Sequence, residues 1–234
     1  SQHIVVSSVV PDQRLQNPFV ILGRARAFEN TINWRIRDNR EQVIAEGFAT
    51  TNAPDVGRFG SFRIRAFYMD MPETDTGTVE VFTLSARDGS EQDMVRIPVR
   101  LNREVLPVKI FFSNIEQDPN ATFCDRVYPV TRRIPKTVNV AEATVLELLK
   151  GPSIREQSMG NRTSIYPGTK LRSINLDDRV ITVDLSKEFT YALSGSCMVQ
   201  AITSQINQTL TQFETIDVAR VLIEGQDAEL ELQP

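Results

Sequence analysis

Residues 140–189 read VAEATVLELLKGPSIREQSMGNRTSIYPGTKLRSINLDDRVITVDLSKEF, and this stretch decides the fold of the second half of the chain. Its first part predicts a helix, because Asn139 and Glu142 have the spacing of a capping box and apolar residues follow on one face. Those apolar residues are Val145, Leu146, Leu148 and Leu149. Gly151 and Pro152 end the helix, since glycine adopts the left-handed turn easily and proline has no N–H to donate.

A polar loop and a β-hairpin follow this helix. The loop, Ser153–Tyr166, is long and polar enough to carry a function. Lys170–Asn175 and Val180–Leu185 alternate in polarity as paired strands do, and residues 176–179 supply a turn between them. We expect one face of the second strand to be buried, with Ile181, Val183 and Leu185 on it.

The rest of the second half predicts three more strands and one more helix. The strands are Val108–Phe112, Val127–Arg133 and Ala219–Glu224. The helix follows the loop Tyr191–Ser196, with Ser194 or Ser196 as its candidate cap. Its apolar face consists of Val199, Ile202, Ile206, Leu210 and Phe213, while Gln205 and Gln212 are expected to point outward. This order predicts an α+β domain with two helices on one mixed or antiparallel sheet.

The first half reads as a succession of strands separated by turn residues. The predicted strands are Ile4–Val10, Phe19–Ala27, Thr31–Arg37, Gln42–Thr50, Arg58–Met69, Gly77–Arg87 and Met94–Leu101. This number of strands in about a hundred residues is typical of an antiparallel, immunoglobulin-like β-sandwich. Trp34 shares its strand face with Ile32 and Ile36, so we expect it to pack between the two sheets.

The first half also resembles the immunoglobulin-like domain of bacterial spore-germination proteins. The most distinctive part is the Gly-x-Ala-x-x-Phe-Glu run, Gly23 to Glu29, supported by Asn17-Pro18-Phe19, Gly60-Ser61-Phe62 and Asp88-Gly89-Ser90. The resemblance implies structural roles for this run. Phe28 would cap the core at the end of a strand, and Glu29 would begin a turn.

The second half resembles the GerMN domain of sporulation and germination proteins. The motifs that carry the resemblance include Leu148-Leu149-Lys150-Gly151-Pro152, Tyr166-Pro167-Gly168-Thr169, Val183-Asp184-Leu185-Ser186 and Val221-Leu222-Ile223-Glu224-Gly225. The resemblance implies a compact fold related to the ring-building modules of spore-envelope complexes. It also implies a secreted or lipid-anchored location outside the cytoplasmic membrane. We place the two domains at residues 1–104 and 107–234.

Charge and composition exclude several classes of protein. The 234 residues carry a net charge of −4, which gives no general attraction to nucleic acid. Alternating arginines such as Arg35 and Arg37 are typical of a solvated sheet face. No apolar run approaches the roughly 20 residues needed to span a bilayer. The chain begins at Ser1 without a visible signal peptide, and we expect it to be a mature or trimmed chain.

The sequence contains two cysteines, Cys124 and Cys197, which are too few for a disulfide scaffold and lack metal-site spacing. In an oxidising location they would form one disulfide, whose long closed loop corresponds to roughly 4 kcal/mol in the chain-entropy treatment. The alternative is a pair of buried thiols.

The residues predict no catalytic, cofactor-binding or metal-binding site. The single histidine, His3, lies near the chain start, so a Ser–His or Cys–His pair within either domain is not expected. Ser186 and Lys187 are adjacent on a strand and would point to opposite faces. Asp184 and Glu188 could in principle act on a glycan, but an Asp that binds local backbone N–H groups explains the first of them better.

These observations favour a non-enzymatic, extracytoplasmic envelope protein that acts as a scaffold through contacts with other envelope proteins or with itself, and the resemblance implies a setting in sporulation or germination. The loop Ser153–Tyr166 is the candidate contact surface. The alternative is a module that binds peptidoglycan or another glycan, for which the candidate aromatic residues are Tyr128, Tyr166 and Tyr191. A third, weaker hypothesis is a wall hydrolase that depends on Asp184.

Overall fold

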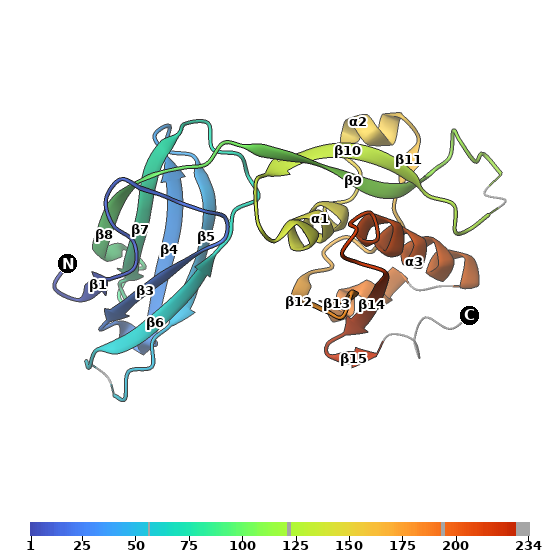
Figure 1. Ribbon diagram of the computed structural model, residues 1–234. Coiled ribbons are helices and arrows are strands. Elements are labelled where there is room, and N and C mark those ends of the chain that lie inside the picture. The colour runs from blue at the N-terminus through green and yellow to red at the C-terminus, as the bar shows by residue number, and fades with distance from the viewer. Residues whose placement is uncertain (56, 121–122, 193–194, 228–234) are drawn as a thin grey trace. The chain divides into compact units, whose positions relative to one another are not determined.

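The computed structural model describes residues 1–55, 57–120, 123–192 and 195–227 (Figure 1). The chain forms two compact units, which are described separately below. The first contains Ser1–Leu106 together with Ile134–Asn139, and the second contains Pro107–Arg133 and the residues from Val140 onward. The domain limits of 1–104 and 107–234 stay a prediction, and the structure adds that Ile134–Asn139 lies with the first unit.

The first unit is the immunoglobulin-like sandwich that the sequence predicts. A three-stranded sheet has the order β1-β3-β6, and a five-stranded sheet has the order β2-β8-β7-β4-β5. The strands are β1 (Ile4–Val6), β2 (Gln13–Arg14), β3 (Phe19–Ala25), β4 (Thr31–Asp38), β5 (Val43–Thr50), β6 (Gly60–Ala66), β7 (Thr76–Leu84) and β8 (Glu91–Arg100). The prediction missed β2, a two-residue strand that runs parallel to β8 and is too short to show a periodicity.

The core of the first unit lies between its two sheets. Trp34 is buried, as predicted, together with Ile32 and Ile36 on the same face of β4. Gly47 lies opposite Trp34 in the neighbouring strand, and a Cβ atom there would come within 3.1 Å of the indole ring. The absence of a side chain at Gly47 therefore makes room for the indole.

The outer face of the five-stranded sheet differs from the solvated face that the alternating arginines predict. Arg35, Glu80 and Arg96 lie side by side on β4, β7 and β8. Glu80 accepts hydrogen bonds from Arg35 and, at 2.8 Å, from Arg96 Nε. The Glu80 and Arg35 side chains are only 6% and 12% exposed, so this pair is largely withdrawn from water, whereas Arg96 is exposed.

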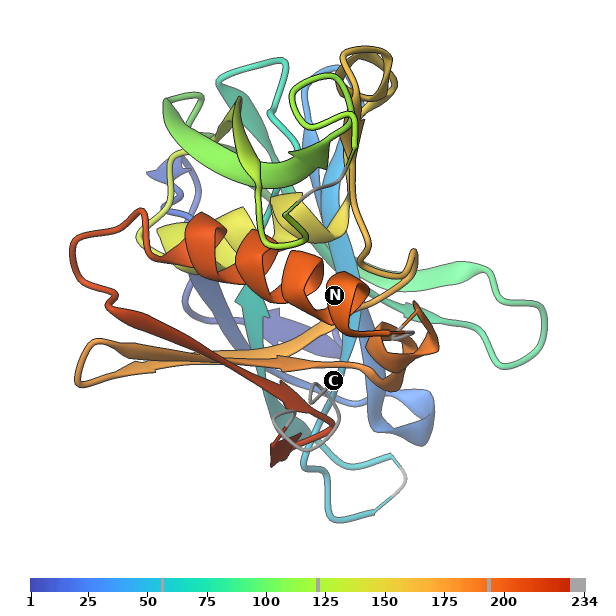
Figure 2. The same cartoon turned by 90° about the vertical axis from the view of Figure 1, so that its right-hand side faces the viewer.

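The described residues of the second unit form two sheets and three α-helices. The helices are α1 (Val140–Leu149), α2 (Ile154–Ser158) and α3 (Ser196–Leu210). One sheet has the order β10-β9-β11, with β9 (Val105–Asn114), β10 (Tyr128–Pro135) and β11 (Asn161–Arg162). The other has the order β12-β13-β14-β15, with β12 (Leu171–Asp177), β13 (Val180–Leu185), β14 (Val218–Ile223) and β15 (Gln226–Asp227). Figures 1 and 2 show α1 and α3 between the two sheets.

The second sheet is mixed, which is one of the two alternatives, mixed or antiparallel, that the sequence left open. β12 and β13 form an antiparallel hairpin, and β13 pairs with β14 in parallel. The hairpin turn consists of Asp178 and Arg179, whose φ angles of 43° and 64° suit the two-residue turns that match strand twist. The predicted buried face is confirmed, because Ile181, Val183 and Leu185 are at most 1% exposed.

Two expectations for the second unit are wrong in part. The prediction of a single sheet misses the three-stranded sheet β10-β9-β11, and the predicted loop Ser153–Tyr166 contains both α2 and β11. The cap of α3 is Gly195, which makes no side-chain hydrogen bond, whereas Ser196 is the first residue of the helix. The other cap candidate, Ser194, lies outside the described residues.

The polar side chains of α3 do not all point outward as predicted. Gln205 is fully buried, and its Oε1 accepts a hydrogen bond from Thr163. Gln212, just after α3, bonds both backbone groups of Lys109, with its Oε1 accepting at 2.9 Å and its Nε2 donating at 2.7 Å. Thr209 accepts from the N–H of Phe111 at 3.1 Å. Gln212 and Thr209 thus satisfy backbone groups along an edge of β9 where none of the described strands pairs with it.

Replacing Gly23 with valine should destabilise the first unit, because a Cβ atom at this position would lie 2.3 Å from the carbonyl oxygen of Val5 and 2.4 Å from the ring of Phe62. We expect a loss of about 1–3 kcal/mol in the free energy of unfolding. Urea denaturation followed by the fluorescence of Trp34, the single tryptophan, measures it.

The control is valine at Arg24, the next residue of β3, which is exposed. This change should alter the free energy of unfolding by less than about 0.5 kcal/mol. Equal midpoints for the two variants would contradict the steric role of Gly23.

Candidate functional site

Arg132 on β10 is the centre of a cluster that fixes the corner between α1 and α2. Its Nη1 donates to the carbonyl oxygen of Glu147 at 2.7 Å, near the end of α1, and its Nη2 donates to that of Gly151 at 2.6 Å. The two carboxylates of the cluster, Glu147 and Glu156, lie 3.1 Å and 2.6 Å from the guanidinium. The three side chains are 12–16% exposed, so the cluster is mostly withdrawn from water.

Arg132 and Glu156 hold each other in the ionised state. Burial by itself raises the pKa of Glu156, but hydrogen bonds from Arg132 and Ser153 outweigh burial and keep the pKa below its ordinary value. Burial likewise lowers the pKa of Arg132, and the two glutamates more than reverse this effect. Arg132 and Glu156 therefore both stay charged at neutral pH.

Helix α2 begins with a capping box that the sequence reading missed. The N–H of Glu156 donates to Ser153 Oγ, and Glu156 Oε2 accepts the N–H of Ser153 at 2.6 Å. The signal was present in the sequence, because Ser153-Ile154-Arg155-Glu156 has the spacing of this motif.

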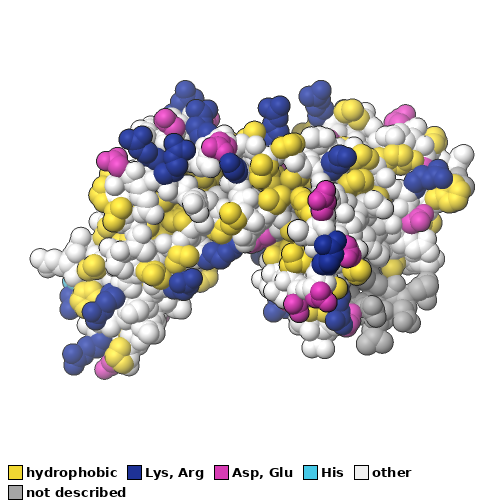
Figure 3. Space-filling view, viewed as in Figure 1, with side chains coloured by type: hydrophobic (Ala, Val, Ile, Leu, Met, Phe, Trp, Pro, Cys, Tyr) yellow, Lys and Arg dark blue, Asp and Glu magenta, His cyan; other side chains and the backbone are white. Residues whose placement is uncertain are grey.

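The helix presents apolar side chains to solvent. Ile154 is 86% exposed and Met159, its C-cap residue, is 59% exposed. We call these two residues the α2 surface. Figure 3 shows apolar side chains at the molecular surface in the region where Figure 1 places α2.

Two of the three candidate aromatic residues come together on the second unit. The rings of Tyr166 and Tyr191 meet edge to face with centroids 5.3 Å apart, and the side chains are exposed. Tyr191 belongs to the 3₁₀ helix η2 (Lys187–Ala192). Tyr128 is not part of this pair, and its hydroxyl lies 3.5 Å from the carbonyl oxygen of Gln117.

The two cysteines are bonded to each other, with their Cα atoms 5.0 Å apart. The disulfide connects the segment before β10 to the first turn of α3. Next to it is a mostly apolar cavity of about 340 Å³, lined among others by Ile115, Phe123 and Met198. The guanidinium of Arg126 lies 4.0 Å from the ring centroid of Phe123.

The groups considered for catalysis have structural contacts instead. Asp184 Oδ1 accepts the N–H of Gly225 at 2.9 Å, and Asp184 Oδ2 lies 3.6 Å from Arg172. Its proposed companion, Glu188, has a pKa lowered by the hydroxyl of Ser186, whereas the acid of a glycosidase needs a raised pKa. In Figure 3, acidic and basic side chains alternate over the region of β12–β15.

The single histidine also lacks the geometry of a serine hydrolase. His3 Nδ1 lies 2.8 Å from Asp93, and the hydroxyl of Ser1 donates to the same carboxylate at 3.2 Å. The hydroxyl therefore contacts the carboxylate and not the imidazole that would activate it. Within the described residues, no group of three His, Cys, Asp or Glu side chains could hold a metal ion.

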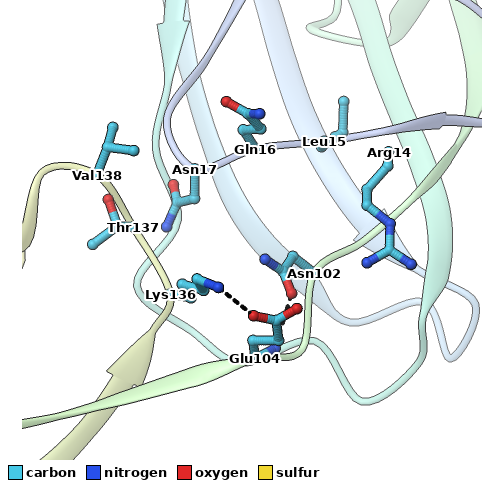
Figure 4. Close-up of a pocket in the computed structure, with 9 residues that line it drawn as sticks. All are labelled: Arg14, Leu15, Gln16, Asn17, Asn102, Glu104, Lys136, Thr137 and Val138. Atoms are coloured by element: carbon cyan, nitrogen blue, oxygen red, sulfur yellow. Dashed lines mark hydrogen bonds and ion pairs between the residues drawn. The ribbon is translucent and has the colours of Figure 1, made fainter.

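The first unit contains a polar cavity of about 390 Å³, shown in Figure 4. Its lining comes from the last residue of β2 and the segment after it, the segment before β9 and the segment after β10. Across it, Lys136 Nζ donates to Glu104 at 2.6 Å, and Arg14 faces the same carboxylate from the other side. The sequence reading missed this site because its charged residues are far apart in the chain.

Comparison with protein families identifies the second unit. A family model described as "Sporulation and spore germination" (Germane) matches residues 109–229, just over half of the chain. The chain belongs to the Germane family. A second model, "Immunoglobulin-like domain of bacterial spore germination" (Gmad2), matches residues 3–90. The expected resemblance of both halves is thereby confirmed.

Solved structures show distant likenesses to this Germane chain, while comparison with curated proteins found no significant match. The tandem GerMN domains of the sporulation protein GerM from Bacillus subtilis are 18% identical over 53% of the chain, with a TM-score of 0.41. The match spans only 41% of that protein. The first GerMN domain of the same protein is 23% identical over 52% of the chain and 85% of its own length, with a TM-score of 0.39.

A putative lipoprotein from Clostridium perfringens is 20% identical over 52% of this chain and 76% of its own, with a TM-score of 0.35. Within the described residues of the Germane chain, no helix is long and apolar enough to cross a membrane.

The Germane motif residues form turns and corners. Gly151 has a φ of 71° and ends α1, and Pro152 follows it. Pro167 and Gly168 form a turn in which Gly168 has a φ of 91° and the N–H of Thr169 donates to the carbonyl oxygen of Tyr166. Gly225, with a φ of 81°, lies in the turn after β14 that Asp184 holds.

In the Gmad2 motif, the residues that pack in the core are not all those that were expected. The prediction that Phe28 caps the core is wrong, because this side chain is 59% exposed. β3 ends at Ala25, and the backbone then enters a 3₁₀ turn, η1 (Phe28–Asn30), that carries the ring outward. Glu29 lies in that turn with a φ of 51°. The packed residues of the motif are Gly23 and Ala25.

Replacing Arg132 with methionine should lower the free energy of unfolding by about 3 kcal/mol, because two mostly buried carboxylates lose their cation. Urea denaturation followed by the helical circular dichroism signal measures this change, since α1, α2 and α3 all belong to the second unit. Methionine at the adjacent, exposed Arg133 is the matched control.

The difference between the two variants should depend on pH. Because the folded-state pKa of Glu156 is lowered, its contribution is fully present above the unfolded-state pKa of about 4.3 and is lost as the pH falls through the folded-state pKa. A difference that stays constant down to about pH 3 would contradict the assignment to this ion pair.

Proposed function

We propose that this protein acts outside the cytoplasmic membrane as a non-enzymatic scaffold of the cell envelope, in sporulation or germination. The observation that carries the proposal is the α2 surface. Its helix is fixed by the Arg132 cluster and by the capping box, yet its apolar side chains face solvent. Two family models, both described by spore germination, support the biological setting.

The fixed position of α2 suits recognition of another protein. Burial of a large aliphatic side chain at an interface contributes about 1.5–3 kcal/mol before the costs of association are subtracted. A contact that is already ordered loses less conformational entropy on binding than a flexible loop does. The partner is another envelope protein, and a second copy of this chain is the alternative occupant.

The disulfide supports the location. Disulfides persist in oxidising compartments and are rare in the reducing cytosol. The bond between Cys124 and Cys197 joins segments 73 residues apart, so it closes a long loop of the second unit. An extracytoplasmic setting keeps such a bond intact.

Replacing both Ile154 and Met159 with serine should reduce cosedimentation of the full chain with isolated cell envelopes at least tenfold. The matched control is serine at Phe48, which is 74% exposed on the first unit. Protease treatment of the envelopes should also abolish binding of the unaltered protein, because the proposed partner is a protein. Unchanged binding of the double variant would exclude the α2 surface as the contact.

Glycan binding is the second candidate function, and the Tyr166–Tyr191 pair is the observation that favours it. Exposed aromatic faces can stack on the apolar face of a sugar ring, and these two rings come from different segments that the fold brings to 5.3 Å. The hydroxyl and the N–H of Thr169 both donate to the carbonyl oxygen of Tyr166, so the backbone that carries one of the rings is held in a turn.

Replacing Tyr191 with alanine should weaken binding to purified, protein-free peptidoglycan about tenfold if the pair holds a glycan, because one of the two stacking surfaces is lost. Alanine at Tyr128 is the control, since that ring lies outside the pair. Absence of any binding of the unaltered protein to protein-free wall would remove the glycan hypothesis and leave the scaffold in place.

A further inference from the structure

We propose that the polar cavity of the first unit binds a carboxylate group at the end of a small peptide-like molecule, with Arg14, Lys136 and Asn102 as its donors. This inference does not depend on the scaffold proposal, which concerns the second unit. Figure 4 shows the guanidinium of Arg14 and the ammonium of Lys136 on two sides of Glu104, with the amide of Asn102 between them.

The walls of the cavity are fixed by backbone hydrogen bonds. The N–H of Leu15 donates to Arg100 at 2.9 Å, and the N–H of Lys136 donates to Glu104 at 2.7 Å. The carbonyl oxygen of Asn17 accepts the N–H of Val138, while its side chain binds both backbone groups of Tyr68. The cavity is therefore already formed before any ligand enters.

The charges of the cavity leave an excess of positive charge. Glu104 is paired with Lys136 at 2.6 Å, and Lys136 followed by Arg14 lowers the pKa of the Glu104 carboxyl. The guanidinium of Arg14 makes no hydrogen bond within the part of the chain that the structure describes. One cation is thus available for an anion, and arginine binds a carboxylate through two parallel hydrogen bonds.

The amide of Asn102 adds a directed donor. Its Oδ1 accepts the N–H of Glu104 at 3.0 Å, which fixes the orientation of the amide and leaves Nδ2 available to donate. In Figure 4, this nitrogen points toward the space between Lys136 and Asn17. A carboxylate in that space receives donors from more than one wall.

The volume of the cavity and the negative charge of Glu104 in its wall both favour an organic carboxylate over phosphate as the ligand. The volume of about 390 Å³ falls in the range of small-molecule sites, roughly 300–1,000 Å³, and exceeds what one ion fills. Leu15 and Val138 line it with apolar groups that suit an organic body. Glu104 repels a doubly charged phosphate more strongly than a singly charged carboxylate.

The test is a titration of the full chain with N-acetyl-alanyl-alanine, followed by the amide signals of Asn102 and Gln16 in NMR spectra. We expect chemical-shift changes that saturate as the dipeptide is added, with an affinity that falls as salt is added. The same dipeptide with a C-terminal amide should produce none. Shifts with the amide equal to those with the acid, or shifts with inorganic phosphate alone, would overturn the carboxylate assignment.

Two substitutions in the cavity should change the affinity for the acid in opposite directions. Arg14→Gln should weaken binding of the acid about tenfold, because it removes a charge-assisted pair. Glu104→Gln should strengthen binding several-fold, because it frees Lys136 and removes the repelling charge. Arg103→Gln, an exposed neighbour outside the cavity, controls for net charge and should leave the affinity unchanged. Weaker binding by Glu104→Gln would contradict the proposal.

Discussion

A guanidinium that is largely withdrawn from water needs acceptors for its N–H groups, and Arg132 finds them in two carboxylates and two backbone carbonyls. These acceptors belong to the end of α1, to Gly151 and to α2. None of the residues of α2 is buried, so polar contacts and not apolar packing hold this helix in place. As a consequence, Ile154 can face solvent, which a helix fixed by its own apolar stripe would not allow.

The first unit depends on a different constraint, the close approach of its strands. Gly23 and Gly47 leave space for the rings of Phe62 and Trp34, so the sandwich core is closed by residues that lack side chains. Polar contacts act mainly on the outer face, where Glu80 bridges arginines from neighbouring strands. Both units therefore combine an apolar core with an ion cluster, which bridges neighbouring strands in the first unit and fixes the corner between two helices in the second.

Periodicity predicted the seven longer strands of the first unit and both long helices of the second, because apolar burial produces these patterns in the sequence. The prediction that Gln212 points outward failed, because its side chain pairs with the backbone of Lys109 at the edge of β9. The apolar periodicity of a helix carries no information about such a polar contact. Phe28 was misplaced because an apolar residue after a strand was assumed to be buried. Neither the Arg132 cluster nor the cavity around Glu104 could be predicted, since their members meet only through tertiary contacts.

Within the described residues, every carboxyl group whose pKa departs clearly from its ordinary value has a lowered pKa. Groups of this kind remain ionised at neutral pH and are poor proton donors there, whereas acid–base catalysis needs a pKa near the working pH. Among these groups, Glu156 orders a helix and Glu104 orients a lysine. In both places the charge of a carboxylate fixes the position of its neighbours, an exposed apolar side chain on α2 in the first case and a cation beside the cavity in the second.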